Sequence, residues 1–434
     1  MDYEAFLREF YRLERFGIKL GLDVITDLLH RLGDPHDRFP AVHVTGTNGK
    51  GSVCAYLASI LRAAGFRVGL YTSPHLVRFN ERIRVNGEMI SDQDVMRLYG
   101  AIRPHMEAMA ARNPVHHPTF FEVTTAMAFE YFAEQEVDIA LVEVGMGGRY
   151  DATNVVDPEV SVITRVGLEH TDHLGRTVRR IAREKAGIIK NGKPAVTVRQ
   201  EALPEIEARC RITGSPLTVV GRDVRFERVR FDLSGQTIRV ENGGSCELEI
   251  PLLGRFQGEN AAVAYAAVQS LRARGWKIED SAMLSGFLST RWPGRLEVVH
   301  RDPAVIVDGA HNPDAAAALA ESLAELVPGK VTLVMGVLAD KDVDLMAAHL
   351  VPIVSKLIAV KPKTERALAP ENVVAAFIAA ASRTGCPVPA VAILPDAKEA
   401  VAAAVREAAK GDVILIAGSI YVAGEALEAL SATL

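Results

Sequence analysis

The chain of 434 residues is too long for a single ordinary hydrophobic core, so we expect at least two domains. Apolar residues make up 49% and charged residues 24%, which is the profile of a soluble globular protein. The mild net charge of −5 argues against a protein that binds nucleic acid or a membrane surface through bulk electrostatics.

Cysteine usage and the opening residues bear on the compartment. The four cysteines are far apart and form no C-x-x-C pair, which argues against a zinc site or a disulfide framework: Cys54, Cys210, Cys246 and Cys386. Met1 to Glu4 open a charged amphipathic stretch rather than a signal peptide. The longest apolar run, from Val413, falls short of the roughly 18 residues that cross a bilayer. We therefore expect a cytoplasmic protein.

The first predicted elements form a βαβ unit. Short β-branched runs alternate with amphipathic helical patterns along the chain, which predicts an α/β fold with a mostly parallel sheet. Ala41–Thr45 is expected to be a buried strand, apolar residues recur at helical spacing over 53–64, and Arg67–Tyr71 is the next strand. The sequence HVTGTNGKGS, residues 43–52, lies at the first turn of this unit, where phosphate sites occur in parallel sheets.

Three further segments follow in the first domain. Residues 72–91 show little helical periodicity, and we expect a long functional loop there. Val137–Val144 and Val160–Thr164 are predicted buried strands. Polar residues follow both, in EVGMGGRYDATN and RVGLEHTDHLG, so they should lie at the ligand-binding edge of the sheet.

The pattern changes over residues 224–251. Alternating apolar positions shift phase near Glu227–Arg228, which predicts a small antiparallel excursion with a bulge or a strand break there, covering an edge of the first domain. A helix is expected over 257–274. Trp292–Arg295 (WPGR) then interrupts the pattern and is the expected hinge. We therefore predict two domains, residues 1–295 and 296–434.

The second domain is predicted to be a smaller, Rossmann-like α/β unit after the P-loop-type first domain. Its helices are rich in alanine. The expected strands and the first helix, at 314–327, follow in regular alternation: Ala304–Asp308, Val331–Gly336, Lys356–Val360, Val391–Leu394 and Val413–Ala417.

HVTGTNGKGS departs from the standard P-loop, G-x-x-x-x-G-K-[ST]. Gly51 separates Lys50 from Ser52, and Val44 stands where the first glycine is expected. Its glycines still allow successive backbone N–H groups to face an anion at a helix N-terminus. Lys50 adds a point charge suited to a phosphate, and Ser52 is placed to reach a metal ion. A tight strand–helix turn is the alternative, but the flanking strand and amphipathic helix favour a nucleotide site.

Other candidates are weak when taken one at a time. Glu143 ends a buried strand, where a carboxylate is costly unless it is paired, and a structural salt bridge is the alternative. His170 is as readily a core or surface histidine, and Lys185, in AREKAGII, has the pattern of an ordinary helical lysine. Asp308 and His311, in DGAHNP, could face a ligand, with capping of the next helix by Asp308 as the simpler explanation.

Together these segments resemble the folylpolyglutamate synthase and dihydrofolate synthase family of the Mur ligase superfamily, over nearly the whole chain. HVTGTNGKGS is similar to the family's P-loop, in which a glycine follows the lysine, and LVEVGMGGRYDATNVV to its second signature. Met146, Tyr150 and Ile420 replace commoner leucines. Shorter matches are YTSPHLVRFNERIRVNG, PTFFEVTT, GLEHTDHLG, REKAGII, WPGRLEVV, DGAHNP and GVLADKD.

The resemblance implies an ATP-dependent amide ligase with its active site between two domains. Such an enzyme adds L-glutamate to dihydropteroate, to tetrahydrofolate (poly)glutamates, or to both, through an acyl phosphate. The implied cofactors are ATP, two Mg²⁺ ions, K⁺, and CO₂ bound as a carbamate on Lys185. The implied partners are small-molecule substrates, with neither nucleic acid nor a membrane, and the implied state is a monomer.

The family's site residues carry over to matching positions of this sequence. The implied ATP-binding residues are Thr47, Asn48, Gly49, Lys50, Gly51, Ser52, Asn260, Arg295 and Asp308. The implied metal ligands are Ser52, Ser73, Glu143, His170 and carbamylated Lys185. The implied catalytic residues are Lys50, Glu143, His170, Lys185 and His311. The implied substrate-binding residues are Ser73, Arg82, Thr119, Phe120, Phe121, Glu122, Tyr150, Asp151, Ala152, His311 and Ser419.

Two alternatives stay open. A ligase of UDP-muramyl peptides would share the P-loop, but Ala41 already begins the P-loop strand, which leaves no separate uridine-binding domain, and TSPHL and TFFE fit the folate enzymes. A regulatory P-loop NTPase is the other alternative. Ala339, in LADKD, occupies the asparagine position of the guanine-reading Asn-Lys-x-Asp motif and argues against it. The sequence leaves open whether the first glutamate, later ones, or both are added.

Overall fold

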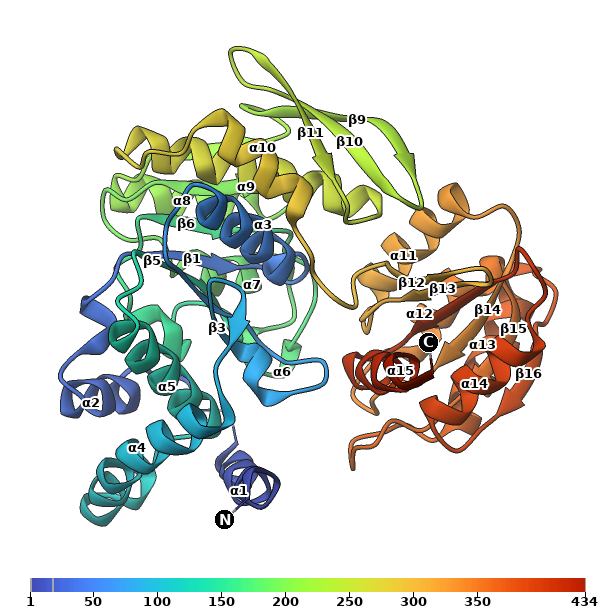
Figure 1. The fold of residues 1–434 in the computed structure, drawn as a ribbon, viewed down its shortest axis with the longest axis horizontal. Coiled ribbons are helices and arrows are strands. Elements are labelled where there is room, and N and C mark those ends of the chain that lie inside the picture. The colour runs from blue at the N-terminus through green and yellow to red at the C-terminus, as the bar shows by residue number, and fades with distance from the viewer. Residues whose placement is uncertain (1, 18, 434) are drawn as a thin grey trace.

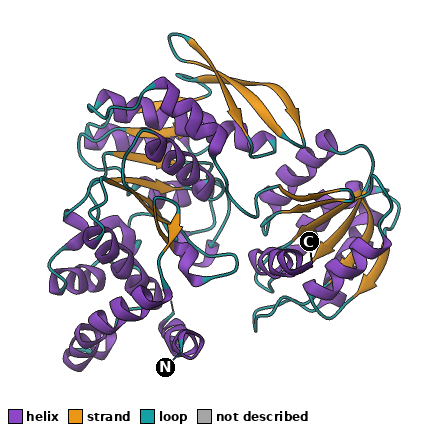
Figure 2. Cartoon of the chain, viewed as in Figure 1, coloured by secondary structure: helices purple, strands orange, loops and turns teal. Residues whose placement is uncertain are grey.

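The computed structural model describes residues 2–17 and 19–433, which form two α/β lobes joined by a linker near residue 292 (Figure 1). Met1 lies outside the described residues. In each lobe helices cover both faces of a sheet (Figure 2). Among the helices of the described residues, none is both long and apolar enough to cross a bilayer.

The N-terminal lobe is built on an eight-stranded sheet with the order β4-β3-β2-β5-β1-β6-β7-β8. In this order, every pair of neighbouring strands between β2 and β8 is parallel, as predicted. Parallel neighbours require a connection that returns the chain to the same end of the sheet. The strands are β1 Ala41–Thr45, β2 Val68–Tyr71, β3 Ile83–Val85, β4 Glu88–Met89, β5 Ile139–Glu143, β6 Val160–Ile163, β7 Ala195–Val198 and β8 Leu217–Val220.

The prediction of a long loop over 72–91 is wrong in part. A short 3₁₀ turn, Phe79–Arg82, leads into β3 and β4, which extend the sheet beyond β2 as an antiparallel hairpin. These strands are too short to produce a clear alternation in the sequence. The segment after β2 is thereby held at the edge of the sheet.

Three groups of helices enclose this sheet. α3, α9 and α10 share one apolar core with it, and α1, α2, α4 and α5 share another on the opposite face. α7 and α8 cover the β6–β7 end. The helices are α1 Tyr3–Phe10, α2 Asp23–Arg31, α3 Lys50–Ala63, α4 Asp92–Arg112, α5 Phe120–Glu134, α6 Thr171–Leu174, α7 Val178–Ala186, α8 Leu203–Thr213, α9 Arg255–Ala273 and α10 Asp280–Ser289.

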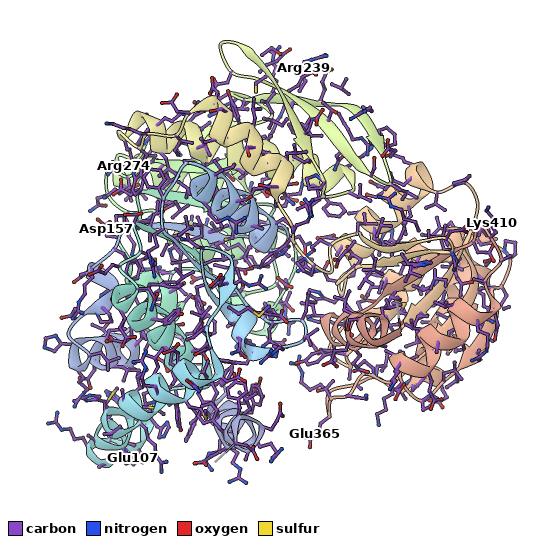
Figure 3. All side chains as sticks on the ribbon, in the orientation of Figure 1. Glu107, Asp157, Arg239, Arg274, Glu365 and Lys410 are labelled. Carbon is purple, nitrogen blue, oxygen red and sulfur yellow. The ribbon has the colours of Figure 1, made fainter. Side chains whose placement is uncertain are left out.

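A three-stranded antiparallel sheet forms where the sequence predicted an excursion. It consists of β9 Arg225–Asp232, β10 Gly235–Glu241 and β11 Ser245–Ile250, and it packs on α9 and α10 (Figure 1). Its register shifts beside Arg228, which confirms the predicted bulge: Thr237 faces Arg230 and the next residue faces Arg228. Arg239 lies on its outer surface, among the peripheral charges labelled in Figure 3.

The C-terminal lobe contains a six-stranded sheet with the order β12-β13-β17-β14-β15-β16. Its strands pair in parallel except β12, an antiparallel edge strand that the strand–helix alternation did not predict. The strands are β12 Glu297–Arg301, β13 Ala304–Val307, β14 Val331–Met335, β15 Val354–Ala359, β16 Ala390–Ile393 and β17 Val413–Ala417. The helices are α11 Pro313–Leu326, α12 Val343–Leu350, α13 Pro370–Thr384, α14 Ala397–Glu407 and α15 Ile420–Thr433.

The linker between the lobes runs from the end of α10 to the start of β12 and contains the predicted hinge. Its last part is fixed to the C-terminal lobe, since the N–H of Gly309 donates to the carbonyl of Gly294 (2.8 Å) and that of Leu296 to Asp308 Oδ2 (2.8 Å). The change of attachment from one lobe to the other therefore falls just before Gly294.

Candidate active site

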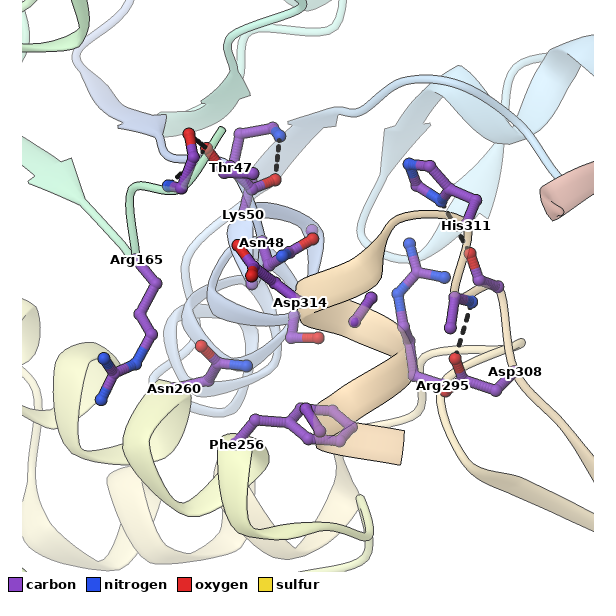
Figure 4. Close-up of a pocket in the computed structure, with 18 of the residues that line it drawn as sticks. Thr47, Asn48, Lys50, Arg165, Phe256, Asn260, Arg295, Asp308, His311 and Asp314 are labelled. Atoms are coloured by element: carbon purple, nitrogen blue, oxygen red, sulfur yellow. Dashed lines mark hydrogen bonds between the residues drawn. The ribbon is translucent and has the colours of Figure 1, made fainter. Parts of the chain in front are cut away.

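A cavity of about 1180 Å³ lies between the two lobes and is lined by both (Figure 4). Its N-terminal wall is formed by loops after β1, β2, β5 and β6, which are neighbours in the sheet, and its C-terminal wall by loops after β13 and β17. The cavity lies at the carboxyl ends of both sheets, where ligands bind in this fold class. Fourteen of the predicted site residues line it: Thr47, Asn48, Gly49, Lys50, Gly51, Ser52, Ser73, Glu143, His170, Asn260, Arg295, Asp308, His311 and Ser419.

The glycine-rich loop connects β1 to α3 and is held tightly. Gly49 has a φ of 94° and lies against Asn260, whose Oδ1 would overlap a Cβ at this position. The N–H of Thr47 donates to the carbonyl of Arg165 (2.7 Å). The Lys50 ammonium turns back onto the carbonyls of Gly46 (3.1 Å) and Thr47 (3.0 Å) (Figure 4). The loop is therefore a rigid turn that carries a cation at a helix N-terminus, which is an anion-binding arrangement.

Glu143 supplies a buried carboxylate at the end of β5. Its side chain is 5% exposed, and Oε2 accepts a hydrogen bond from the N–H of Ser73 (3.2 Å). Burial raises the pKa of Glu143, and the nearby charge of Lys50 opposes that rise. A carboxylate in this position favours a cation in the cleft.

A buried polar chain supports Ser52 from the side of α9. Gln257 donates from Nε2 to Ser52 Oγ (3.0 Å), and Asn260 donates from Nδ2 to Gln257 Oε1 (3.0 Å). Ser52 and Asn260, both predicted, are thus connected through Gln257, which was not. Its signal in the sequence is the i, i+3 spacing to Asn260 on one helix face.

The interpretation of Lys185 as an ordinary helical lysine is wrong. The residue lies on α7 but is only 3% exposed, and its Nζ donates to the carbonyl of Gly46 (2.8 Å) beneath the glycine-rich loop. Burial, together with the charge of Lys50, lowers the pKa of Lys185 to about 7. Within the described part of the chain no carboxylate lies within ion-pair distance of its ammonium group.

The cleft also brings His170 and His311 together through Glu169, a residue that the sequence analysis missed. His170 precedes α6 with a φ of 51°, and burial lowers its pKa. Glu169 Oε1 lies 3.6 Å from His311 Nε2 on the opposite wall. Burial alone would raise the pKa of Glu169, but the neighbouring His311 imidazole and the charge of Lys50 bring it well below its usual range. A carboxylate beside a candidate histidine in the same loop was the available signal.

The C-terminal wall is ordered by Asp308 and Asn312. Asp308 Oδ1 accepts from the N–H of Ala310 (2.7 Å), and burial raises its pKa. Asn312 caps α11 through the N–H of Ala315 (2.8 Å), so the explanation of Asp308 as the helix cap is wrong. Asn312 also donates from Nδ2 to Asn48 Oδ1 across the cleft (3.2 Å).

Arg82 lies outside the lining of this cavity, in the aromatic core of the N-terminal lobe. It is 8% exposed, donates from Nε to His75 Nδ1 (2.8 Å), and its guanidinium lies 5.4 Å from the centre of the Phe120 ring. Among the described residues it has no carboxylate within ion-pair distance. Its charge is therefore free to face an anionic ligand.

The other predicted pterin-binding residues also lie outside the cavity lining, and Thr119, Glu122 and Asp151 form internal hydrogen bonds. Glu122 and Thr119 form a capping box at the start of α5, with Glu122 Oε2 accepting from the Thr119 N–H (2.7 Å) and hydroxyl (2.8 Å). Asp151 Oδ2 accepts from the N–H of Met146 (2.8 Å). Tyr150 is 41% exposed. Substrate contact by Thr119, Phe120, Phe121, Glu122, Tyr150, Asp151 and Ala152 stays a prediction.

A glycine-rich loop at a helix N-terminus, beside a buried carboxylate and two lysines and facing a second α/β lobe, is the arrangement expected of the Mur ligase superfamily. Two family models match the chain accordingly. The Mur ligase middle domain matches residues 44–268, and the Mur ligase glutamate ligase domain matches residues 294–420.

The particular family follows from relatives that match over most of the chain. A probable bifunctional folylpolyglutamate synthase/dihydropteroate synthase of Halobacterium salinarum is 40% identical over 98% of this chain and 51% of its own length. The Bacillus subtilis dihydrofolate synthase/folylpolyglutamate synthase is 39% identical over 77% of this chain and 80% of its own. The structure of Escherichia coli FolC in complex with DHPP and ADP superimposes with a TM-score of 0.87 at 32% identity, covering 98% of both chains.

The chain belongs to the folylpolyglutamate synthase and dihydrofolate synthase family. It spans about half the length of the Halobacterium relative and about four-fifths of the Bacillus relative. The expected α/β fold, with a large and mostly parallel first sheet and a smaller second α/β unit, is confirmed.

Proposed function

We propose that this chain joins L-glutamate to the carboxylate of dihydropteroate, of tetrahydrofolate (poly)glutamates, or of both, at the expense of ATP. The supporting observation is a cleft that both lobes line, with Lys50 and Glu143 on one wall and Arg295 and His311 on the other. An ATP phosphate on the glycine-rich loop would there face the second lobe, which matches a glutamate ligase domain.

The reaction proceeds in two steps. A substrate carboxylate oxygen attacks the γ-phosphorus of ATP, which releases ADP and leaves an acyl phosphate. The amine nitrogen of glutamate then attacks the acyl carbon, the C–O bond to phosphate breaks, and an amide, inorganic phosphate and a proton result. Lys50, at the N-terminus of α3, stabilises the charge of the transferring phosphoryl group. The two opposed walls keep water from the acyl phosphate.

Mg²⁺ ions are implied by the family, and the donors present fit them. Magnesium in phosphoryl-transfer sites uses one or two carboxylates with hydroxyls and substrate phosphates rather than a cage made only of protein groups. Among the described residues no cluster of three or more His, Cys, Asp or Glu suited to a metal is found. Glu143 would be shared between the two ions, one of them also held by Ser52 and Ser73 and the second by His170. The ions, when bound, neutralise charge on the phosphates.

Lys185 suits the predicted carbamate. Addition of CO₂ needs a neutral amine, and full burial with no carboxylate partner in the described chain favours the neutral form. The carbamate would present anionic oxygens under the glycine-rich loop, next to the cleft. Together with the Glu143 carboxylate, it would supply oxygen ligands for Mg²⁺.

We assign the remaining contacts and the domain boundary as follows. Arg82 would bind a substrate carboxylate, and His311 and Ser419 would contact the glutamate. The first domain comprises residues 1–295 and the second 296–434. Since both walls of the cleft come from one polypeptide, we propose that a monomer working in the cytoplasm suffices.

The test is ADP release by the purified protein with MgATP. We expect release to require both L-glutamate and either dihydropteroate or tetrahydrofolate monoglutamate. The two folate substrates are compared side by side, and the products are resolved by glutamate number. A protein that hydrolyses ATP at the same rate with neither substrate is a regulatory NTPase, and one that turns over neither folate substrate contradicts the proposal.

A further inference from the structure

Gly51 interrupts the usual P-loop spacing, and its own backbone does not require a glycine. It is the second residue of α3, and its φ lies outside the left-handed region, unlike that of Gly49 at 94°. Glycine is also the poorest helix former after proline. An alanine would therefore suit the backbone at position 51 better, so the reason for the glycine must lie in a neighbouring residue.

That neighbour is Trp292. A Cβ at Gly51 would lie 3.0 Å from Nε1, 3.1 Å from Cζ2 and 3.2 Å from Cε2 of the indole, and these are its three nearest heavy atoms. Such contacts are closer than side chains in folded proteins normally make, so one partner would have to move. The indole occupies the space that a side chain at position 51 would need.

The indole is supported from a second direction. The guanidinium of Arg84 lies over the Trp292 ring, 5.8 Å from its centre, and Arg84 Nε donates to the carbonyl of Glu81 (3.1 Å). Arg84 belongs to β3, in the hairpin that extends the N-terminal sheet. The partly buried Trp292 thus lies between this hairpin and helix α3, which begins in the glycine-rich loop.

Trp292 also stands next to the point where the chain changes lobes. Two residues further on, Gly294 is bonded to Gly309 of the C-terminal lobe (2.8 Å), and Pro293 between them has a restricted φ. A displacement of the C-terminal lobe is therefore transmitted over two residues to a ring that touches the phosphate loop.

We infer that Trp292 is a positioning residue for nucleotide binding. Its indole holds the start of α3 through direct contact with Gly51 and couples the linker between the lobes to the phosphate loop. This inference rests on the proposed use of that loop for ATP. The intervening glycine is, in this account, a steric adaptation to a tryptophan from the linker.

A double-mutant cycle tests the contact, with MgADP affinity measured by calorimetry. Gly51→Ala should raise the Kd for MgADP by about tenfold or more, because the new methyl group overlaps the indole. Trp292→Leu should raise it by only a few-fold. In the double variant, Gly51→Ala should add little to the effect of Trp292→Leu. Trp276 provides the matched control, and Gly51→Ala/Trp276→Phe should keep the full defect.

A defect of Gly51→Ala that persists undiminished beside Trp292→Leu overturns the inference. It would mean that the bound phosphate itself, rather than the indole, excludes a side chain. Wild-type protein that binds no MgADP would instead contradict the proposed function. The two failures are therefore distinguishable.

Fluorescence decides the question if the Gly51 variants do not fold. The chain has two tryptophans, so Trp276→Phe leaves Trp292 as the sole reporter. Trp276 packs on Phe66 (5.2 Å between ring centres), away from the cleft. We expect the fluorescence emission of Trp292 to change on addition of MgADP until it saturates, with the same Kd that calorimetry gives. Unchanged emission at saturating MgADP would contradict the coupling.

Discussion

The two walls of the cleft are built differently, although both lie at the carboxyl ends of neighbouring parallel strands. In the N-terminal wall, Glu143 and Lys185 are buried and bonded within their own lobe. In the C-terminal wall, His311 and Asn312 reach across to Glu169 and Asn48. Under the proposed function, the N-terminal wall holds the lysines and the carboxylate that act on the ATP phosphates, while the C-terminal wall adds Arg295 and contacts that depend on the approach of the lobes.

This contrast predicts how variants divide. Changes in the N-terminal wall should lower kcat, because they remove charges that stabilise the transition state. Changes in the C-terminal wall should act mainly on KM, because they weaken substrate binding and contact between the lobes.

The largest effect is expected for Lys185→Ala. Loss of the buried amine should lower kcat about 10²–10³-fold, as removal of a preorganised electrostatic group does elsewhere, while MgADP binding stays largely intact. The assay is ligation with bicarbonate present, alongside calorimetry with MgADP. Lys185→Arg is the control, since it keeps a positive charge but forms no carbamate, and it should be equally inactive. Near-normal turnover in either variant would show that the carbamate role does not apply.

A smaller effect is expected for His311→Ala on the opposite wall. The variant loses the proposed hydrogen bond from His311 to the charged glutamate substrate. This loss should raise the KM for L-glutamate roughly tenfold to a hundredfold, with a lesser change in kcat. Initial rates at varied glutamate concentration measure both. If kcat fell as far as in Lys185→Ala with KM unchanged, the proposed division between the walls would be wrong.

The stability of the folded protein should decrease in acid because of a buried histidine in the N-terminal lobe. His43 is fully buried on β1, its Nε2 lies 2.8 Å from Thr153 Oγ1, and burial lowers its pKa to about 3. Between pH 6.5 and 3 the unfolded chain therefore binds a proton that the folded chain does not, and stability falls as pH falls. From pH 7 to 5 this group alone should cost about 2 kcal/mol. His43→Gln should show a shallower decline of unfolding temperature over that range. An equal slope would contradict the assignment.

The smallest effect concerns an ionic contact between the lobes. Glu325 of α11 pairs with Arg228 of β9 and with Arg255 of α9 (2.6 Å to Oε1). Glu325→Ala leaves a partly buried arginine without its partner, and we expect the unfolding temperature to fall by about 2–4 °C with little change in kcat. Arg239→Ala, on the exposed face of the same three-stranded sheet, is the control and should leave the midpoint unchanged. An equal shift in both variants would show that the contact between the lobes is not special.

The sequence predicted those features that depend on local pattern. Parallel strands, the glycine-rich turn and the bulge near Arg228 follow from periodicity and residue type, and all are present. The burial of Lys185 was not predicted, because helical spacing does not show which other segment packs against a given face of the helix. Trp292 was noted only as part of a hinge, since its contact with Gly51 joins positions far apart in the chain. The spacing of residues within one helix or strand gives no information on contacts between segments that are distant in the sequence.

The central claim is that a substrate carboxylate is activated by phosphoryl transfer from ATP in this cleft. The most direct test supplies dihydropteroate or tetrahydrofolate monoglutamate labelled with ¹⁸O in the reacting carboxylate, together with MgATP and L-glutamate, and analyses the inorganic phosphate by mass spectrometry. Our account predicts one ¹⁸O atom transferred to phosphate for each amide bond formed. Amide formation with unlabelled phosphate would contradict an acyl phosphate and, with it, the proposed mechanism.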